Sequence, residues 1–186
     1  MSVPRYHCCV YICITMISIL NATRDDIPTI RQLAEKIWWP TYSSIIPQGQ
    51  IEYMLATIYS ESTIREKMNN GSEIFLLLKD HGKEKAFASY GTSQQSGNVW
   101  KINKLYVLPE CHGKGFGKAL IDEIYARAIK NDINTLILNV NRSNPAFAFY
   151  QKYGFKTLRE EDIPIGPYWM NDYVLVLPVS THPETK

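Results

Sequence analysis

The fold is decided by residues 105–118, LYVLPECHGKGFGK, where an apolar strand pattern stops at Pro109 and three alternating glycines follow. Residues 98–108 alternate in the way a strand does, and residues 116–131 repeat apolar side chains at helical spacing. A helix begins with unpaired backbone N–H groups and about half a positive charge, so a loop without side-chain bulk can wrap a phosphate there. The stretch therefore predicts a strand, a phosphate-binding loop and a helix.

The loop contains three small residues and two cations, namely Gly113, Gly115, Gly117, Lys114 and Lys118. Taken alone, it also fits a flexible turn that begins a helix. Two common nucleotide loops are excluded by position. A P-loop requires glycine at 112 and Ser or Thr at 119, where His112 and Ala119 stand, and the dinucleotide fingerprint requires glycine at 118, where Lys118 stands.

The rest of the chain has helical patterns before this stretch and alternating strands and helices after it. Helices are expected at residues 26–44, 51–59, about 60–70, 116–131 and 145–153, and strands at 17–22, 73–79, 85–92, 98–108, 135–140, 155–158 and 172–177. A helix that links two strands of one sheet makes them parallel. We therefore expect a mixed α/β sheet with helices on both faces and one parallel pair joined by the helix at residues 116–131.

Bulk composition narrows the function. A chain of 186 residues with 45% apolar and 20% charged content fits one globular domain. With 20 basic and 18 acidic residues, the net charge of +2 offers no basic field for nucleic acid, so we expect a small-molecule partner. Cys8, Cys9, Cys13 and Cys111 have no metal-ligand spacing, so we predict no metal, reduced thiols and a cytoplasmic location.

The amino terminus allows two interpretations. Arg5 and the apolar run at residues 10–20 resemble a secretory signal, but the run is too short to span a bilayer and continues directly into the expected first strand. Met16 is the alternative start. We interpret residues 1–15 as an extension, 16–178 as a single domain and 179–186 as a tail, with no membrane segment.

The pattern Leu105-Tyr106-Val107-x-Pro109-x-x-His112-x-x-Gly115-x-Gly117 resembles the central motif of the GCN5-related N-acetyltransferase (GNAT) family. The family usually has Gln or Arg where His112 stands. The resemblance covers residues 17–177. It implies an α/β fold of the α+β mixed-sheet type: a central, largely antiparallel seven-stranded sheet with one splayed parallel pair and helices on both faces.

The resemblance also implies that acetyl-coenzyme A binds in the gap of the splayed pair. Backbone groups of Leu105 and Val107 would bind the pantetheine like an added strand, and the Leu105 amide would polarise the thioester carbonyl. Their side chains otherwise fit a plain sheet core. The residues assigned to the cofactor are Leu105, Tyr106, Val107, His112, Gly113, Lys114, Gly115, Phe116, Gly117, Lys118, Asn144 and Tyr150.

A second motif lies at residues 144–155, NPAFAFYQKYGF, which fits a helix with an Asn cap, an early Pro and a Gly stop. It resembles the family's second motif, in which the asparagine contacts the cofactor and the tyrosine lies by its sulfur. A phenol with a pKa near 10 is protonated at neutral pH, so Tyr150 is our candidate acid for the leaving thiolate. The alternative is an aromatic residue that only packs the helix.

The base is less clear, because the strand at residues 100–105 lacks the Glu that many family members place there. A water chain or Asp172 on the last strand must serve, unless Asp172 is only structural. The rival function is a non-catalytic acyl-CoA-binding regulatory module, against which the retained Tyr150 argues. A symmetric dimer is the default assembly.

The acceptor is expected between the opening helices and the last loop, where aromatic and acidic residues gather: Trp38, Trp39, Tyr42, Tyr53, Tyr59 and residues 160–162. Such groups can hold a cation, or they are core aromatics and a solvated acidic turn. Residues 39–42 and 170–174 resemble a bacterial branch that includes polyamine acetylators, which implies a small amine such as spermidine or spermine. Protein amino termini and amino-sugar antibiotics remain open.

Overall fold

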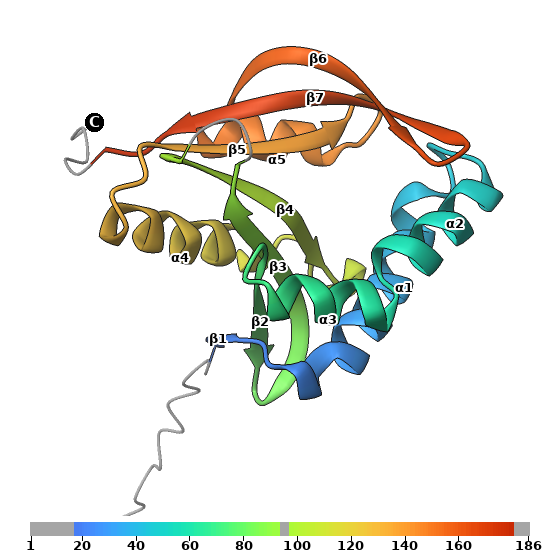
Figure 1. Cartoon of the computed structure of the whole chain (residues 1–186), viewed down its shortest axis with the longest axis horizontal. Helices are drawn as coiled ribbons and strands as arrows, with labels where there is room; N and C mark the ends of the chain where they lie inside the picture. Colours follow the sequence, from blue (N-terminus) through green and yellow to red (C-terminus); the bar gives the residue numbers. More distant parts are fainter. Residues whose placement is uncertain (1–16, 94–96, 181–186) are drawn as a thin grey trace, which may run out of the picture.

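The computed structural model describes residues 17–93 and 97–180. In this part of the chain the protein is built on one seven-stranded sheet (Figure 1). In spatial order the strands are β1 (Ile17–Asn21), β2 (Ile74–Asp80), β3 (Lys83–Thr92), β4 (Val99–Val107), β5 (Thr135–Asn141), β7 (Tyr168–Pro178) and β6 (Lys156–Ile165). Only β4 and β5 pair in parallel. The predicted fold class is confirmed. The predicted extension and most of the tail lie outside the described residues.

Five helices cover the two faces of this sheet. They are α1 (Ile27–Tyr42), α2 (Gln48–Ile58) and α3 (Glu61–Asn69) on one side, and α4 (Phe116–Lys130) and α5 (Ala146–Tyr153) on the other. On β3, the ring of Phe87 contacts Tyr59 after α2, whereas the hydroxyl of Tyr90 accepts a hydrogen bond from Arg127 of α4. The middle of β3 is therefore buried on both faces. As the predicted helix at residues 26–44 requires, α1 continues through Pro40.

A β-bulge lies where the site forms. Ser89 of β3 is opposite Lys104 of β4, but the next residue, Tyr90, is opposite Ile102, so Asn103 is an extra residue. The parallel pairing of β4 with β5 ends at the same place, at Ile102 and Leu138. A bulge bends its strand and increases the local twist. The remainder of β4 consequently diverges from β5, which is the splay that the sequence motif implied.

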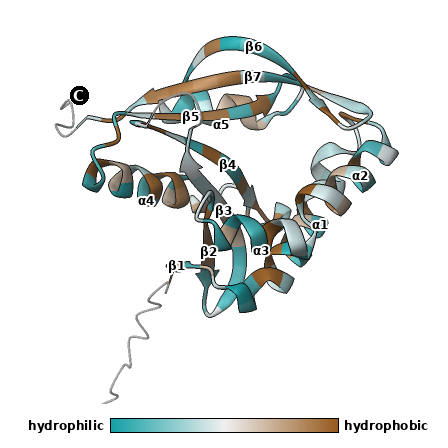
Figure 2. Cartoon of the chain, in the orientation of Figure 1, coloured by the Kyte–Doolittle hydropathy of each residue, from teal (hydrophilic) through white to brown (hydrophobic). Residues whose placement is uncertain are grey.

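The closing hairpin is longer than predicted. Instead of an acidic turn between short strands, residues 160–162 lie inside β6, and β7 already begins at Tyr168. Acidic residues and Pro164 have low strand propensity, so the sequence pattern did not predict the second half of β6. An edge strand tolerates both. Figure 2 shows the difference: β6 is largely hydrophilic, whereas the middle of β7 is hydrophobic.

The tip of this hairpin packs on α2. The buried Gln50 donates a hydrogen bond from Nε2 to the Trp169 carbonyl at 2.8 Å, and the ring of Tyr53 contacts Tyr168. Gly166 has a φ of 58°, and a Cβ there would lie 2.1 Å from the Tyr53 hydroxyl oxygen. Glycine is therefore required at this turn. The contact closes the space between the helices and the sheet.

Candidate active site

A cleft of about 1330 Å³ opens beside the divergent end of β4. Of the residues predicted to bind the cofactor, Leu105, Tyr106, Val107, His112, Gly113, Gly115, Phe116, Gly117, Lys118, Asn144 and Tyr150 line it. Within the described chain, Lys114 does not line the cleft, and the Lys118 ammonium pairs with Asp122 at 2.6 Å. The loop therefore presents its backbone to the cleft more than its two cations.

The conformation of the glycine loop explains its composition. Gly113 and Gly115 have φ values of 78° and 82°, in the left-handed region that side chains disfavour. A Cβ on Gly117 would lie 3.2 Å from Cζ of Phe149, so this glycine allows α4 and α5 to approach. No described side chain caps α4. The first-turn amides of α4 are thus suited to an anion.

His112 stands at the start of the loop. Its Nε2 donates a hydrogen bond to the backbone carbonyl of Val107 at 3.1 Å. That carbonyl was expected to pair with pantetheine as with an added strand. Because a carbonyl oxygen can accept two hydrogen bonds, pairing at this position would share the oxygen with His112 or replace its bond.

The second motif adds the other wall of the cleft. The side-chain oxygen of Asn144 accepts a hydrogen bond from the amide of Ala146, the first residue of α5, at 2.9 Å. The helix begins one residue later than predicted, with Pro145 at the N-cap position. Tyr150 is 8% exposed and lies against the rings of Phe149 and Phe155. Burial raises the pKa of Tyr150, and negative charge on Tyr42 would raise it further. The phenol is therefore protonated at neutral pH.

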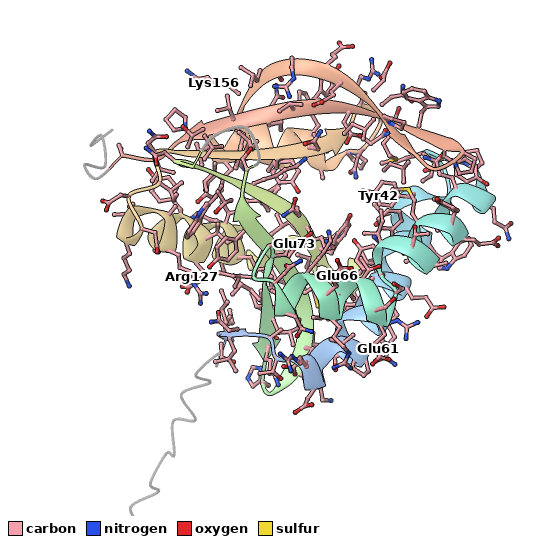
Figure 3. The ribbon with its side chains drawn as sticks, viewed as in Figure 1. Tyr42, Glu61, Glu66, Glu73, Arg127 and Lys156 are labelled. Carbon is pink, nitrogen blue, oxygen red and sulfur yellow. The ribbon has the colours of Figure 1, made fainter. Side chains whose placement is uncertain are left out.

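A smaller cavity of about 130 Å³ adjoins the cleft, between α1, α2, the sheet and the closing hairpin. Asp172 lines this cavity, whereas Tyr150 lines the cleft. The two spaces share five wall residues, Tyr42, Asn103, Lys104, Tyr106 and Asn139. Figure 3 shows Tyr42 between α1 and the sheet. The two predicted catalytic side chains, Tyr150 and Asp172, thus lie in adjacent spaces that share a wall.

Asp172 is the carboxylate of the small cavity. It is 6% exposed, and burial raises its pKa to about 6, an effect that Lys101 opposes. The side-chain amide of Asn139 faces Asp172 from the neighbouring strand, and its hydrogen bond lowers the pKa of Asp172. Apart from each other, neither Oδ1 of Asp172 nor Nδ2 of Asn139 has a hydrogen-bond partner among the described residues.

Sequence reasoning missed a buried ion pair beside the bulge. Lys104 and Glu73 are 4% and 6% exposed, and Nζ of Lys104 lies 2.7 Å from Oε2 of Glu73 (Figure 3 labels Glu73). Ser89 donates to the same oxygen, and Lys67 contacts the other. Burial lowers the pKa of Lys104 to about 8. Burial alone would raise the pKa of Glu73, but the contacts with Lys104, Lys67 and Ser89 outweigh burial, so the pKa of Glu73 is lowered. A lysine inside an apolar strand pattern was the available signal.

The expected acceptor residues are divided. Trp38, Tyr42 and Tyr59 line the small cavity, and Nε1 of Trp38 donates to the Tyr59 hydroxyl at 3.1 Å. The acidic residues are already paired: Glu160 and Asp162 bind Arg142, and Glu161 binds Arg159. The acidic run is therefore largely neutralised.

Two broader findings concern metals and membranes. In the described part of the chain, no three His, Cys, Asp or Glu side chains gather as metal ligands. None of its helices has the length and apolar character needed to cross a membrane.

Comparison with known proteins gives the family. The profile of the acetyltransferase (GNAT) domain matches residues 43–166. The chain belongs to the GNAT family. It is therefore an acetyl-CoA-dependent N-acetyltransferase, in agreement with the resemblance of its two motifs.

Individual GNAT relatives are moderately similar. A Bacillus subtilis protein named Uncharacterized N-acetyltransferase YuaI is 27% identical over 153 residues, 81% of this chain and 87% of that protein. Spermidine N(1)-acetyltransferase of Thermoplasma acidophilum is 28% identical over 142 residues, 75% of this chain and 88% of that protein. The crystal structure of the PaiA N-acetyltransferase of Thermoplasma acidophilum with coenzyme A superposes with a TM-score of 0.74 and 26% identity, covering 87% of this chain and 98% of that one.

Proposed function

We propose that this GNAT enzyme transfers the acetyl group of acetyl-CoA directly to a primary amine that enters the small cavity. The observation that carries the proposal is the common wall of the two spaces at the β4 bulge, with Tyr150 on the cleft side and Asp172 on the cavity side. The loop from His112 to Lys118 would hold the pyrophosphate of the cofactor. Pantetheine would lie along the open edge of β4.

The reaction needs three proton transfers. The acceptor arrives mainly as ammonium, and Asp172, directly or through water, would take one proton because its raised pKa makes it a better base than an exposed carboxylate. The free amine attacks the thioester carbon, and the Leu105 amide would stabilise the oxyanion. As the carbon–sulfur bond breaks, the protonated Tyr150 would give its proton to the thiolate. The new amide nitrogen would then release its extra proton to the Tyr150 phenolate, directly or through water.

The acceptor class is the finer part of the proposal. Spermidine and spermine are the first acceptors to assay, because a relative is named spermidine acetyltransferase and the end of the chain resembles the polyamine branch. Small-molecule binding, a cytoplasmic location and a dimer stay predictions. No observation favours a non-catalytic binding module over an enzyme.

Thiol release from acetyl-CoA in the presence of an amine panel tests this function. We expect acetyl-CoA to bind by calorimetry and at least one amine to release free coenzyme A with formation of its acetamide. Binding without transfer to any amine would instead identify a regulatory acyl-CoA-binding module.

A further inference from the structure

The charges around the small cavity limit how many ammonium groups it can accept. Asp172 is the one carboxylate that lines it within residues 17–93 and 97–180. The neighbouring acids of β6 are bound by Arg142 and Arg159, and Glu73 is bound by Lys67 and Lys104. Lys104 itself lines the cavity, and Lys101 influences Asp172. The cavity thus offers one anion and at least one cation.

The neutral polar groups of the cavity differ in whether they are already hydrogen-bonded. Asn141 accepts from the Ser143 amide through Oδ1, and Asn103 donates from Nδ2 to the Lys101 carbonyl. Asn139 is different, because its Nδ2 has no described partner other than the facing carboxylate of Asp172, whose Oδ1 likewise has no other described partner. An amide nitrogen carries two N–H groups and a carboxylate oxygen has two lone pairs, so each atom keeps one free hydrogen-bonding site. A free donor beside a free acceptor is matched by a ligand that carries both.

We infer that the acceptor is a monoamine with a hydroxyl or carbonyl oxygen within three bonds of its nitrogen. This inference rests on the proposed function and narrows its acceptor. The ammonium donates to Oδ1 of Asp172, and Nδ2 of Asn139 donates to the oxygen. Asn139 is then a specificity-determining residue.

A polyamine satisfies this arrangement less well. Spermidine has no oxygen, so it leaves one N–H of Asn139 Nδ2 unpaired. Its additional ammonium groups also meet the Lys104 side of the cavity, where Glu73 is already shared between two lysines. The same two features favour an amino alcohol, an amino sugar or an α-amino amide.

A matched pair of amines tests the inference in the wild-type enzyme. The probes are 1-amino-2-propanol and isobutylamine, which differ by a hydroxyl in place of a methyl group and are compared at equal concentrations of unprotonated amine. We expect kcat/KM to be at least about tenfold higher for the amino alcohol, since a site built to hydrogen-bond a hydroxyl rejects the analogue without it. Glucosamine and alaninamide then distinguish a hydroxyl from a carbonyl source.

The variant Asn139→Leu locates the effect. The ratio of the two kcat/KM values should fall to near one, whereas Asp172→Asn should lower both values and keep the ratio. Acetyl-CoA binding by calorimetry shows that each variant is folded. A wild-type ratio near one, a ratio unchanged in Asn139→Leu, or a higher kcat/KM for spermidine than for every oxygen-bearing amine overturns the inference. Absence of thiol release with every amine refutes the proposed function itself.

Discussion

The cleft assigned to the cofactor and the cavity proposed for the acceptor are neighbours built in different ways. The longest part of the cleft wall is one stretch of chain, from Ile102 in β4 through the glycine loop to Lys118, and α1, β5 and α5 supply most of the remainder. The cavity instead collects a few side chains each from α1, α2, β4, β5, β6 and β7. A site formed in large part by one continuous stretch leaves a sequence motif, whereas a site made of scattered side chains does not.

The largest expected effect concerns Tyr150, on the cleft side of the common wall. Tyr150→Phe should lower kcat at least about 100-fold, because general acids typically contribute 10²–10⁴-fold. The calorimetric affinity for acetyl-CoA should change little, since the ring remains. Tyr90→Phe, which removes another buried hydroxyl outside the lining of the cleft, is the control. Wild-type turnover in Tyr150→Phe would remove the acid role.

The next effect belongs to the cavity alone. Asp172→Asn should lower kcat/KM about 100-fold, the lower end of the range of general-base contributions. In the wild type, kcat/KM should fall as the pH drops below about 6, because the raised pKa of Asp172 leaves the carboxyl protonated there. That inflection should disappear in Asp172→Asn. The control variant Asp162→Asn, at a carboxylate that pairs with Arg142, should keep the inflection near pH 6. An inflection that persists in Asp172→Asn would show that Asp172 is not the base and that water alone serves.

A smaller effect is expected in the cleft alone. Gly115→Ala forces a side chain into the left-handed region at a φ of 82°, a strain of about 1–2 kcal/mol, so acetyl-CoA affinity should weaken about tenfold. Gly82→Ala is a matched control, because Gly82 has a φ of 74° in the turn between β2 and β3. Calorimetry should find its acetyl-CoA affinity equal to that of the wild type. Equal weakening in both variants would show general destabilisation.

The smallest effect concerns stability. The folded-state pKa of Asp172 is raised, so folding binds a proton and stability is lost as the pH rises from about 4 to about 6. Asp172→Asn removes the cost of the buried charge and should raise the free energy of unfolding at pH 7.5 by about 1 kcal/mol. Denaturation at pH 7.5 and pH 3.5 checks this. A gain of equal size at both pH values would point to another cause.

Much of the fold followed from pattern, and the failures have physical reasons. The amphipathic helix at residues 116–131 and the buried strands were predictable because their apolar spacing is periodic. The full length of the β6–β7 hairpin was not, because the acidic residues and Pro164 of β6 are tolerated only at a sheet edge. The acidic run looked like a cation site until the structure paired it with Arg142 and Arg159.

By itself the sequence predicted the donor half of the proposed site, since the glycines at 113, 115 and 117, Asn144 and Tyr150 lie in two short motifs. Only the tertiary structure brought together the proposed acceptor half. Asn103 becomes a bulge only through its partner strands, and Asn139 meets Asp172 only because β5 lies beside β7. Lys104 and Glu73 are tolerable in the core only as a pair. Contacts between distant residues depend on packing, which no local pattern records.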